Sequence, residues 1–159
     1  MLSSRSATLA TSFSGDGMLT TAIGAGEDLG YRVTVQADGK ILVAGQSHNG
    51  SNYDFAVARY NTDGSLDTSF DGDGKLTTSI FGSSNDFARG VAIQADGKIV
   101  VAGSSDNGGN YDFAAVRYNT DGSLDTSFDG DGRVTTAFVV TPSSQDEVNS
   151  VAIQADGKI

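Results

Sequence analysis

Apolar and polar residues alternate over several short stretches of the chain, with the period of two that an extended strand requires. Leu76, Thr78 and Ile80, for example, fall on one side of such a strand, and polar side chains fall on the other. Residues 99–102 instead form a continuous apolar run, as expected of a strand that is covered on both faces. The pattern predicts four β-strands, at 75–80, 90–94, 98–104 and 112–119.

Tight-turn signals separate these predicted strands. Asp96-Gly97, between the second and the third strand, is a two-residue Asp-Gly hairpin signal. The sequence NTDGSLD after the fourth strand predicts a turn that leads into the next unit. Because a two-residue turn joins antiparallel neighbours, we expect a four-stranded antiparallel sheet.

The same unit recurs along the chain. RYNTDGSLDTSFDGDG at 59–74 returns unchanged 58 residues later, and QADGKI occurs three times, beginning at 36, 94 and 154. Length differences between the copies fall between predicted strands, where a loop absorbs them. We therefore divide the chain into a lead-in, two repeats and a partial third repeat: 1–10, 11–67, 68–125 and 126–159.

Four-stranded sheets repeated along a chain are typical of a β-propeller, so we predict an all-β, propeller-like array of four-stranded antiparallel blades. A linear β-stack or solenoid of the same units is the alternative. The chain holds about 2.6 repeats of about 58 residues, whereas closed propellers have roughly four to eight blades. The array is thus expected to be incomplete. Three explanations are open: a fragment of a longer parent chain with further repeats, closure as a homo-oligomer, and an open stack capped by the partial repeat.

Composition favours strands and turns over helices. Of the 159 residues 38% are hydrophobic, 21 are Gly, and 18 of the 20 acidic residues are Asp, a residue type that prefers turns. The net charge of −10 repels phosphates, so neither nucleic acid nor an anionic membrane surface is expected as a partner. No apolar stretch reaches the ~20 residues of a membrane span, so membrane insertion is not expected. The absence of Cys removes disulfides and Cys-type zinc sites.

Acidic residues recur in the turns after the fourth predicted strand, and we treat them as candidate calcium ligands. Calcium takes six to eight oxygens, which short Asp-Gly loops can supply. The sequence DGDG is only a fragment of the calcium loop D-x-[DN]-x-[DN]-G, and no Glu follows at the twelfth position. The alternative is that Asp and Gly serve two successive turns, in which case Asn would replace Asp with little effect. The candidates are Asp63, Asp67, Asp71, Asp73, Asp121, Asp125, Asp129 and Asp131.

Candidate catalytic residues are few. His48 is the single histidine, it lies in the loop sequence QSHNGSNYD, and its counterpart in the next repeat is Asp106. No Ser lies in a G-x-S-x-G elbow, so a Ser–His–Asp mechanism has no support. A carboxylate that occupies the same place in every repeat is better explained as a turn or cap residue than as half of a glycosidase pair. This interpretation applies to Asp28, Asp86 and Asp146.

Arginine and aromatic residues recur in the fourth predicted strand. Arg59 and Arg117 stand at its end, and each is expected to pair with a neighbouring Asp in an architectural contact. Aromatic residues two apart share one face of the strand. We expect them to fill the space between adjacent sheets, and an aromatic platform for a sugar or a peptide is the alternative. These aromatic residues are Tyr53, Phe55, Tyr111 and Phe113.

The combination QADGKIVVAG, YDFAAVRYNTDGSLDTSF and DGDGKLTT resembles the bacterial delta-60 repeat, over about residues 11–159. The resemblance implies a propeller-like fold within larger bacterial secreted or surface-exposed proteins, and it implies no reaction. The first copy departs from the pattern, because Ala10 stands where the later copies have Asp67 and Asp125. An extracellular or cell-surface location is thus expected from the resemblance alone.

Taken together, these patterns predict a non-enzymatic scaffold for structure or binding in a secreted or cell-surface protein. A calcium-dependent module that binds a carbohydrate or a protein is the first alternative. A hydrolase or lyase that uses the loop carboxylates is the second. No cofactor is expected apart from the calcium of the first alternative.

Overall fold

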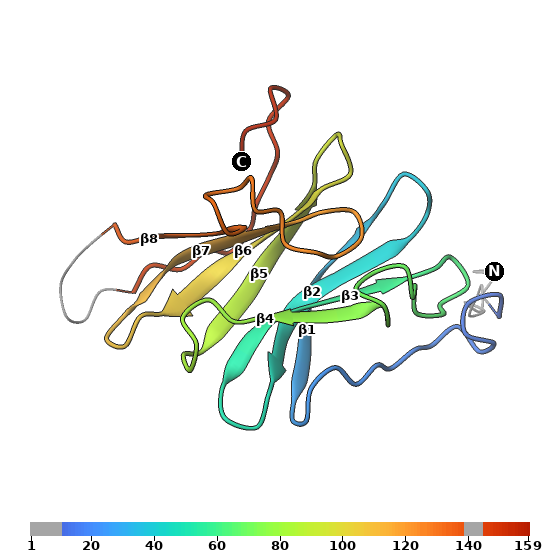
Figure 1. Ribbon diagram of the computed structural model, residues 1–159. Coiled ribbons are helices and arrows are strands. Elements are labelled where there is room, and N and C mark those ends of the chain that lie inside the picture. The colour runs from blue at the N-terminus through green and yellow to red at the C-terminus, as the bar shows by residue number, and fades with distance from the viewer. Residues whose placement is uncertain (1–10, 139–144) are drawn as a thin grey trace, which may run out of the picture.

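The computed structural model describes residues 11–138 and 145–159, and its regular structure there consists of strands in two four-stranded antiparallel sheets (Figure 1). The first sheet contains, in spatial order, β1 (Asp28–Val35), β2 (Ile41–His48), β3 (Tyr53–Tyr60) and β4 (Lys75–Thr78). The second contains β5 (Asp86–Ile93), β6 (Ile99–Asp106), β7 (Tyr111–Tyr118) and β8 (Arg133–Thr136). The lead-in at 1–10 lies outside the described residues. No helix in the described part of the chain is long and apolar enough to cross a membrane.

The prediction of an all-β, propeller-like array of four-stranded antiparallel blades is confirmed, and each sheet forms one blade. The stretch at 75–80 does form a strand, but β4 pairs with β3 through Phe55 opposite Thr78 and Val57 opposite Leu76. β4 therefore completes the first blade, although it lies in the second sequence repeat. Alternation indicates which residues are extended. Which strand they pair with depends on packing against residues that are distant in the sequence.

The first strand of each blade contains a β-bulge. Tyr31 in β1 and Arg89 in β5 are the extra residues at which the pairing register shifts. Beside each bulge a glycine allows the backbones to approach closely. A Cβ on Gly45 would overlap the carbonyl oxygen of Leu29, and a Cβ on Gly103 would overlap that of Phe87. The glycines in β2 and β6 are therefore required by contact with the neighbouring backbone.

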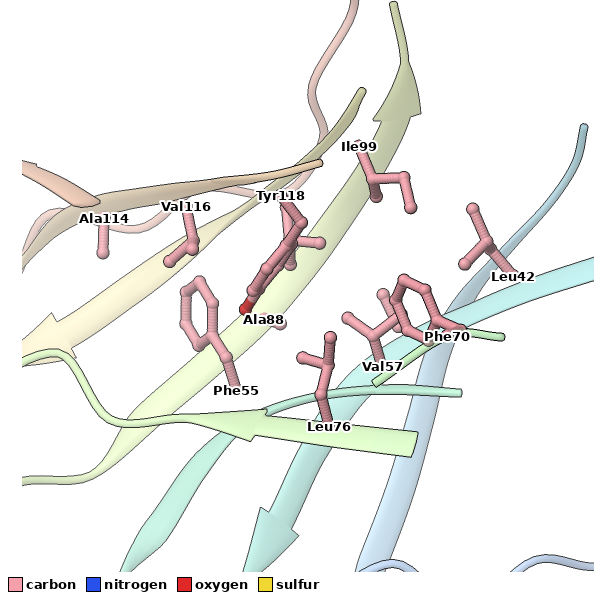
Figure 2. Packing of buried hydrophobic residues seen from close by; sticks show 12 residues of the cluster. Leu42, Phe55, Val57, Phe70, Leu76, Ala88, Ile99, Ala114, Val116 and Tyr118 are labelled. Atoms are coloured by element: carbon pink, nitrogen blue, oxygen red, sulfur yellow. The ribbon is translucent and has the colours of Figure 1, made fainter. Parts of the chain in front are cut away.

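The hydrophobic core lies between the two blades (Figure 2). Phe55 and Val57 of β3 and Leu76 of β4 point at the second blade, and Val116 and Tyr118 of β7 point back at the first. The Tyr118 side chain is 1% exposed, and its hydroxyl donates a 2.8 Å hydrogen bond to the hydroxyl of Thr78 across the core. The blades thus bury one sheet face each against the other, which is how a sheet with one apolar face is stabilised.

Two further segments lie against the outer faces of this pair of blades. Residues 11–23 precede β1 and run beside the first blade, where the backbone amide of Ser14 donates to the carbonyl of Asp63 at 2.8 Å. Residues 145–159 follow the second blade, and the amide of Asp146 donates to the carbonyl of Tyr111 at 2.8 Å. They correspond in sequence to the outer strand of a preceding blade and to the inner strand of a following one.

Candidate functional site

The two blades meet through a contact that we call the joint, formed by Phe70 and Asp71 of the first blade and by Asp121 and Gly122 of the second. The Phe70 side chain is 0% exposed, and its ring atoms lie 3.1 Å from where a Cβ on Gly122 would be placed. Asp71 has the positive φ of 51° that Asp tolerates in turns, and its amide donates to the carbonyl of Asp121 at 2.7 Å. A side chain at position 122 would crowd the ring and the Asp71 amide.

Parts of the joint recur at both ends of the pair of blades. Ser14 has the same φ of 51° as Asp71 and binds the turn of the first blade, while Phe13 lies 3.2 Å from the Cβ position of Gly64. Asp129 also has a φ of 51°, but Phe128 beside it is only half-buried, because no complete sheet follows in the described residues. The repeat therefore carries one half of a joint at each end.

A carboxylate anchors the segment that leads into each blade. The amide of Ile80 donates to Asp86 at 2.8 Å, the amide of Ile23 donates to Asp28 at 2.8 Å, and the amide of Phe138 donates to Asp146 at 2.9 Å. The interpretation of these three carboxylates as turn or cap residues is confirmed by these contacts.

Burial differs between the first two of these anchoring carboxylates. Asp86 is 0% exposed, and this burial raises its pKa even though Ser84, Ser105 and the Ile80 amide donate hydrogen bonds to it. Asp28 is only half-buried. Burial opposes its ionisation, but the hydrogen bonds from the amides of Ile23 and Gly24 and from Ser47 outweigh this effect and lower the pKa of Asp28. The second blade therefore buries a carboxylate that the first blade leaves partly in water.

Each blade contains an ion pair between an arginine and a buried aspartate, Asp67 in the first blade and Asp125 in the second. The Arg59 Nε lies 2.7 Å from Asp67, and the Arg117 Nε lies 2.6 Å from Asp125, which confirms the expected Arg–Asp pairing. Lys40 approaches Asp67 at 3.3 Å, and Lys98 approaches Asp125 at 2.9 Å. The interpretation of these two Asp residues as turn residues alone is incomplete, because each also neutralises two cations. Asn at these positions would leave the arginine without its carboxylate partner, whereas Lys40 also approaches Asp38 at 3.5 Å and Lys98 approaches Asp96 at 4.0 Å.

Ionisation of Asp67 is strongly favoured. Burial opposes it, but the hydroxyl and amide of Ser69, the ammonium of Lys40 and the charge of Arg59 together lower the pKa of Asp67 to about 2. In the second blade the hydroxyl of Ser127 and the ammonium of Lys98 lower the pKa of Asp125 in the same way. Both carboxylates are therefore fully charged at neutral pH.

Arg59 also links the two blades directly. Its guanidinium lies 4.5 Å from the centre of the Phe70 ring, and its Nη1 donates to the carbonyl of Thr120 in the second blade at 2.5 Å. Arg117 lies 4.7 Å from the Phe128 ring in the corresponding place. One arginine thus neutralises Asp67, stacks on the aromatic residue of the joint and binds the next blade.

The structure does not bring the acidic candidates together as a metal site. Asp63 accepts hydrogen bonds from the amide and hydroxyl of Ser65, and Asp73 accepts one from the amide of Lys75. Asp121 and Asp131 repeat these contacts, and Asp67 and Asp125 face their cations. Asp71 and Asp129 adopt the left-handed conformation. Among residues 11–138 and 145–159, no group of three or more His, Cys, Asp or Glu residues could hold a metal ion.

Aromatic side chains form a row along the edge where the β2–β3 and β6–β7 loops lie. The row consists of His48, Tyr53, Phe87 and Tyr111, with successive ring centres 4.9, 6.0 and 5.5 Å apart. All four side chains are half-buried, whereas Phe55 lies fully in the core. Core packing is therefore confirmed for Phe55, while the aromatic row continues across both blades at the surface.

Sequence reasoning missed the lysines and the joint itself. Lys40 and Lys98 occur directly after the Asp-Gly hairpin turns, and nothing local to them indicates a partner 27 residues further on. A signal for the joint was present, because the string at 59–74 and 117–132 repeats the Arg, Asp, Ser and Phe of this network without change. Such complete recurrence over a long string indicates that these side chains contact one another.

Comparison with protein families matches two segments of the chain, 36–70 and 94–128, to the domain of unknown function (DUF5122) beta-propeller. The first match contains β2, β3 and the pair Arg59–Asp67, and it ends at Phe70. The second contains β6, β7 and the pair Arg117–Asp125, and it ends at Phe128. A comparison with curated proteins found no match. These two segments are thus similar to a β-propeller repeat of unknown function.

Proposed function

We propose that this chain is a non-enzymatic scaffold, a β-propeller repeat segment of the delta-60 type, within a bacterial secreted or cell-surface protein. One observation carries the proposal: the charged residues that recur in both blades contact other parts of the repeat. Arg59, Asp67 and Lys40 form an ion-paired cluster, and Asp86 binds the entering segment. Side chains held in this way position the blades relative to each other.

The surroundings of His48 support the non-enzymatic part of the proposal. Its Nδ1 accepts a 3.1 Å hydrogen bond from the amide of Gly50, and its ring packs edge-on against Tyr53 at 4.9 Å. A general base needs a free nitrogen within reach of a nucleophile and an orienting partner behind it. Because Nδ1 accepts this hydrogen bond, Nε2 carries the proton of the neutral ring, and neither nitrogen offers a free lone pair to a nucleophile.

The test of the scaffold is thermal unfolding of the chain in EDTA and in calcium. We expect the same melting temperature in both, because the carboxylates already bind amides, hydroxyls and cations of the repeat. A saturable rise with calcium would instead support the calcium-dependent module, because a ligand that binds only the folded state stabilises it. The variant Asp63→Asn is the control, since it removes one exposed carboxylate while Asn keeps the turn.

A carbohydrate- or protein-binding module is the second candidate, and the aromatic row favours it. Tyr53 and Tyr111 each present a half-buried ring beside an Asn-rich loop, and the Tyr53 hydroxyl donates to Glu27 at 2.9 Å. Aromatic faces flanked by amides and carboxylates can stack on a sugar ring and hydrogen-bond its hydroxyls. Titration calorimetry with soluble oligosaccharides tests this candidate. Binding that Tyr111→Ala removes and Phe138→Ser leaves intact would support it, and no heat with any glycan would contradict it.

A further inference from the structure

Two arginines, Arg32 and Arg89, differ from the other basic residues in the described part of the chain. Among residues 11–138 and 145–159, neither guanidinium has a carboxylate within 4.0 Å, although the chain carries 20 acidic residues. The other described basic residues each have one: Lys40, Arg59, Lys75, Lys98, Arg117, Arg133 and Lys158. A guanidinium is always charged and carries five N–H donors, so these two arginines retain the capacity to bind an anion.

Both of these guanidiniums contact the same residue, Tyr31, at the bulge of β1. Arg89, at the bulge of β5, places its guanidinium 4.4 Å from the centre of the Tyr31 ring. Arg32 donates from Nη1 to the carbonyl of Tyr31 and from Nη2 to the carbonyl of Asn149, both at 2.9 Å. The strands β1 and β5 lie side by side, so the convergence is made by the two blades themselves (Figure 1). Two positive charges beside one residue attract an anion more strongly than either would alone.

The aromatic row continues from this pair of arginines. The guanidinium of Arg89 lies 6.0 Å from the centre of the Phe87 ring, which is a member of the row. The acidic residue of this region is Glu27, which accepts the Tyr53 hydroxyl at 2.9 Å and has neither guanidinium within 4.0 Å. A ligand that stacks on the row therefore has a guanidinium within reach at one end.

We propose that Arg32 and Arg89 bind the carboxylate of an acidic sugar, a uronate, whose ring stacks on the aromatic row. The planar fork of a guanidinium matches the two oxygens of a carboxylate, and aromatic faces such as that of Phe87 suit a sugar ring. The inference rests on the second candidate function, the binding of a carbohydrate, and it names the class of sugar. The scaffold function does not depend on it.

The three sequence copies differ at the bulge, while the residues around it are repeated. An Asp stands three residues before the bulge position, and QADGK begins five residues after it, in every copy. The bulge position and the next residue are Tyr31-Arg32, Arg89-Gly90 and Asn149-Ser150. A β-bulge re-aims the side chain of its extra residue. The repeated residues build the blade, and the bulge position is where the copies differ in what they present to a ligand.

Charge limits the length of the ligand. The net charge of −10 repels a long anionic polymer, whereas at about 0.15 M salt charges more than about 8 Å away are largely screened. A short uronate therefore experiences mainly the two nearby guanidiniums. The probe that follows is a trisaccharide of galacturonic acid, and its methyl ester is the matched ligand, because the ester keeps the sugar rings and removes their charge.

Titration calorimetry of the whole chain with these two trisaccharides is the test. We expect the acid to bind at least about tenfold more tightly than the ester, because hydrogen bonds to a charged group are the stronger ones. Arg32→Gln and Arg89→Gln should each weaken binding of the acid at least about tenfold and leave binding of the ester unchanged. Arg133→Gln removes the same charge from β8, at the opposite edge of the sheet from β5, and should bind the acid as the unchanged chain does. A circular dichroism melt of each variant shows whether its fold is kept, and Arg32 is exposed, so its loss should leave the fold intact.

The outcomes separate this proposal from the carbohydrate candidate on which it rests. Equal affinity for the acid and the ester, lost in Tyr111→Ala, would overturn the uronate and keep the carbohydrate candidate. No heat with either trisaccharide would overturn the uronate proposal, and the calorimetry with other oligosaccharides would then decide the candidate alone. Binding of the acid that neither arginine variant weakens would overturn the assignment of Arg32 and Arg89. Acetate that binds as tightly as the acid would overturn the role of the sugar ring.

Discussion

The ring of Phe70 in the first blade occupies the space that a side chain on Gly122 of the second blade would fill, at 3.1 Å from its Cβ position. Phe70 follows the buried ion pair of its own blade, and Gly122 lies in the NTDG turn of the next. This contact therefore ties a turn in one blade to the charge network of another. The same contact recurs between Phe13 and Gly64, so it is an element that sets one part of the array upon the next.

Gly122→Ala should destabilise the protein more than Gly130→Ala does. Both glycines have a φ of +92°, so both substitutions carry the same left-handed backbone strain, about 1–2 kcal/mol. A Cβ at Gly130 meets nothing within 4 Å, whereas a Cβ at Gly122 meets the Phe70 ring and the Asp71 amide. Urea unfolding of the two variants measures the difference, and equal losses of stability would contradict a packed joint.

Phe70→Ala should cost about 3–5 kcal/mol in the free energy of unfolding, the usual range for a fully buried Phe. Phe128→Ala removes the same residue type at the same place in the second blade, with the same arginine contact, but from a half-buried position. We expect it to cost about half as much or less. Chemical denaturation of the two variants measures both losses. Their difference is the part of the free energy of unfolding that Phe70 gains by packing against the following blade.

Asp67→Asn should destabilise the protein by about 3 kcal/mol, because Arg59, itself 4% exposed, would lose its counter-ion. Asp63→Asn is the control and should change stability by less than about 0.5 kcal/mol, because Asp63 is exposed and Asn keeps the turn. Thermal melts at neutral pH compare the two. If Asp67 served the turn alone, both substitutions would be nearly silent.

Acid should unfold the protein by protonating Asp67 and Asp125. The folded-state pKa of Asp67 is lowered from 3.8 to about 2, so its contribution to stability is complete above pH 3.8 and is lost as the pH falls towards 2. Asp86 acts in the opposite direction. Because its pKa is raised in the folded state, its ionisation lowers the free energy of unfolding as the pH rises. In Asp67→Asn the loss of stability between pH 4 and 2 should be shallower than in the unchanged chain, which acid titration followed by circular dichroism measures. If stability fell equally steeply between pH 4 and 2 in both proteins, acid unfolding could not be assigned to protonation of Asp67.

Much of the fold is predictable from local pattern, as the stretches at 98–104 and 112–119 illustrate, both of which fall on strands of the second blade. The partner of a strand is less predictable, as 75–80 illustrates, because β4 joins the blade before it. Alternation reports that a stretch is extended, but which neighbour it pairs with depends on burial across the whole unit.

The sequence likewise predicts only part of the charged cluster around Asp67. The pairing of Arg59 with Asp67 was accessible, because both residues recur together within eight positions. The third member, Lys40, was not, since it comes from another hairpin and meets Asp67 only in the folded blade. The pattern of the acidic turns favours plain turns but does not exclude calcium loops, because both use Asp and Gly and differ in where the carboxylates point.

Exchange of the Asp71 and Asp129 backbone amides with deuterium, followed by nuclear magnetic resonance, tests the joint most directly. Both residues have a φ of 51° in the same local sequence, and Asp71 donates across the blades to Asp121 at 2.7 Å. If the blades dock as described, the Asp71 amide exchanges far more slowly than the Asp129 amide, because it opens only when the blades part. Equal and rapid exchange of both amides would show that the blades do not form this joint in solution.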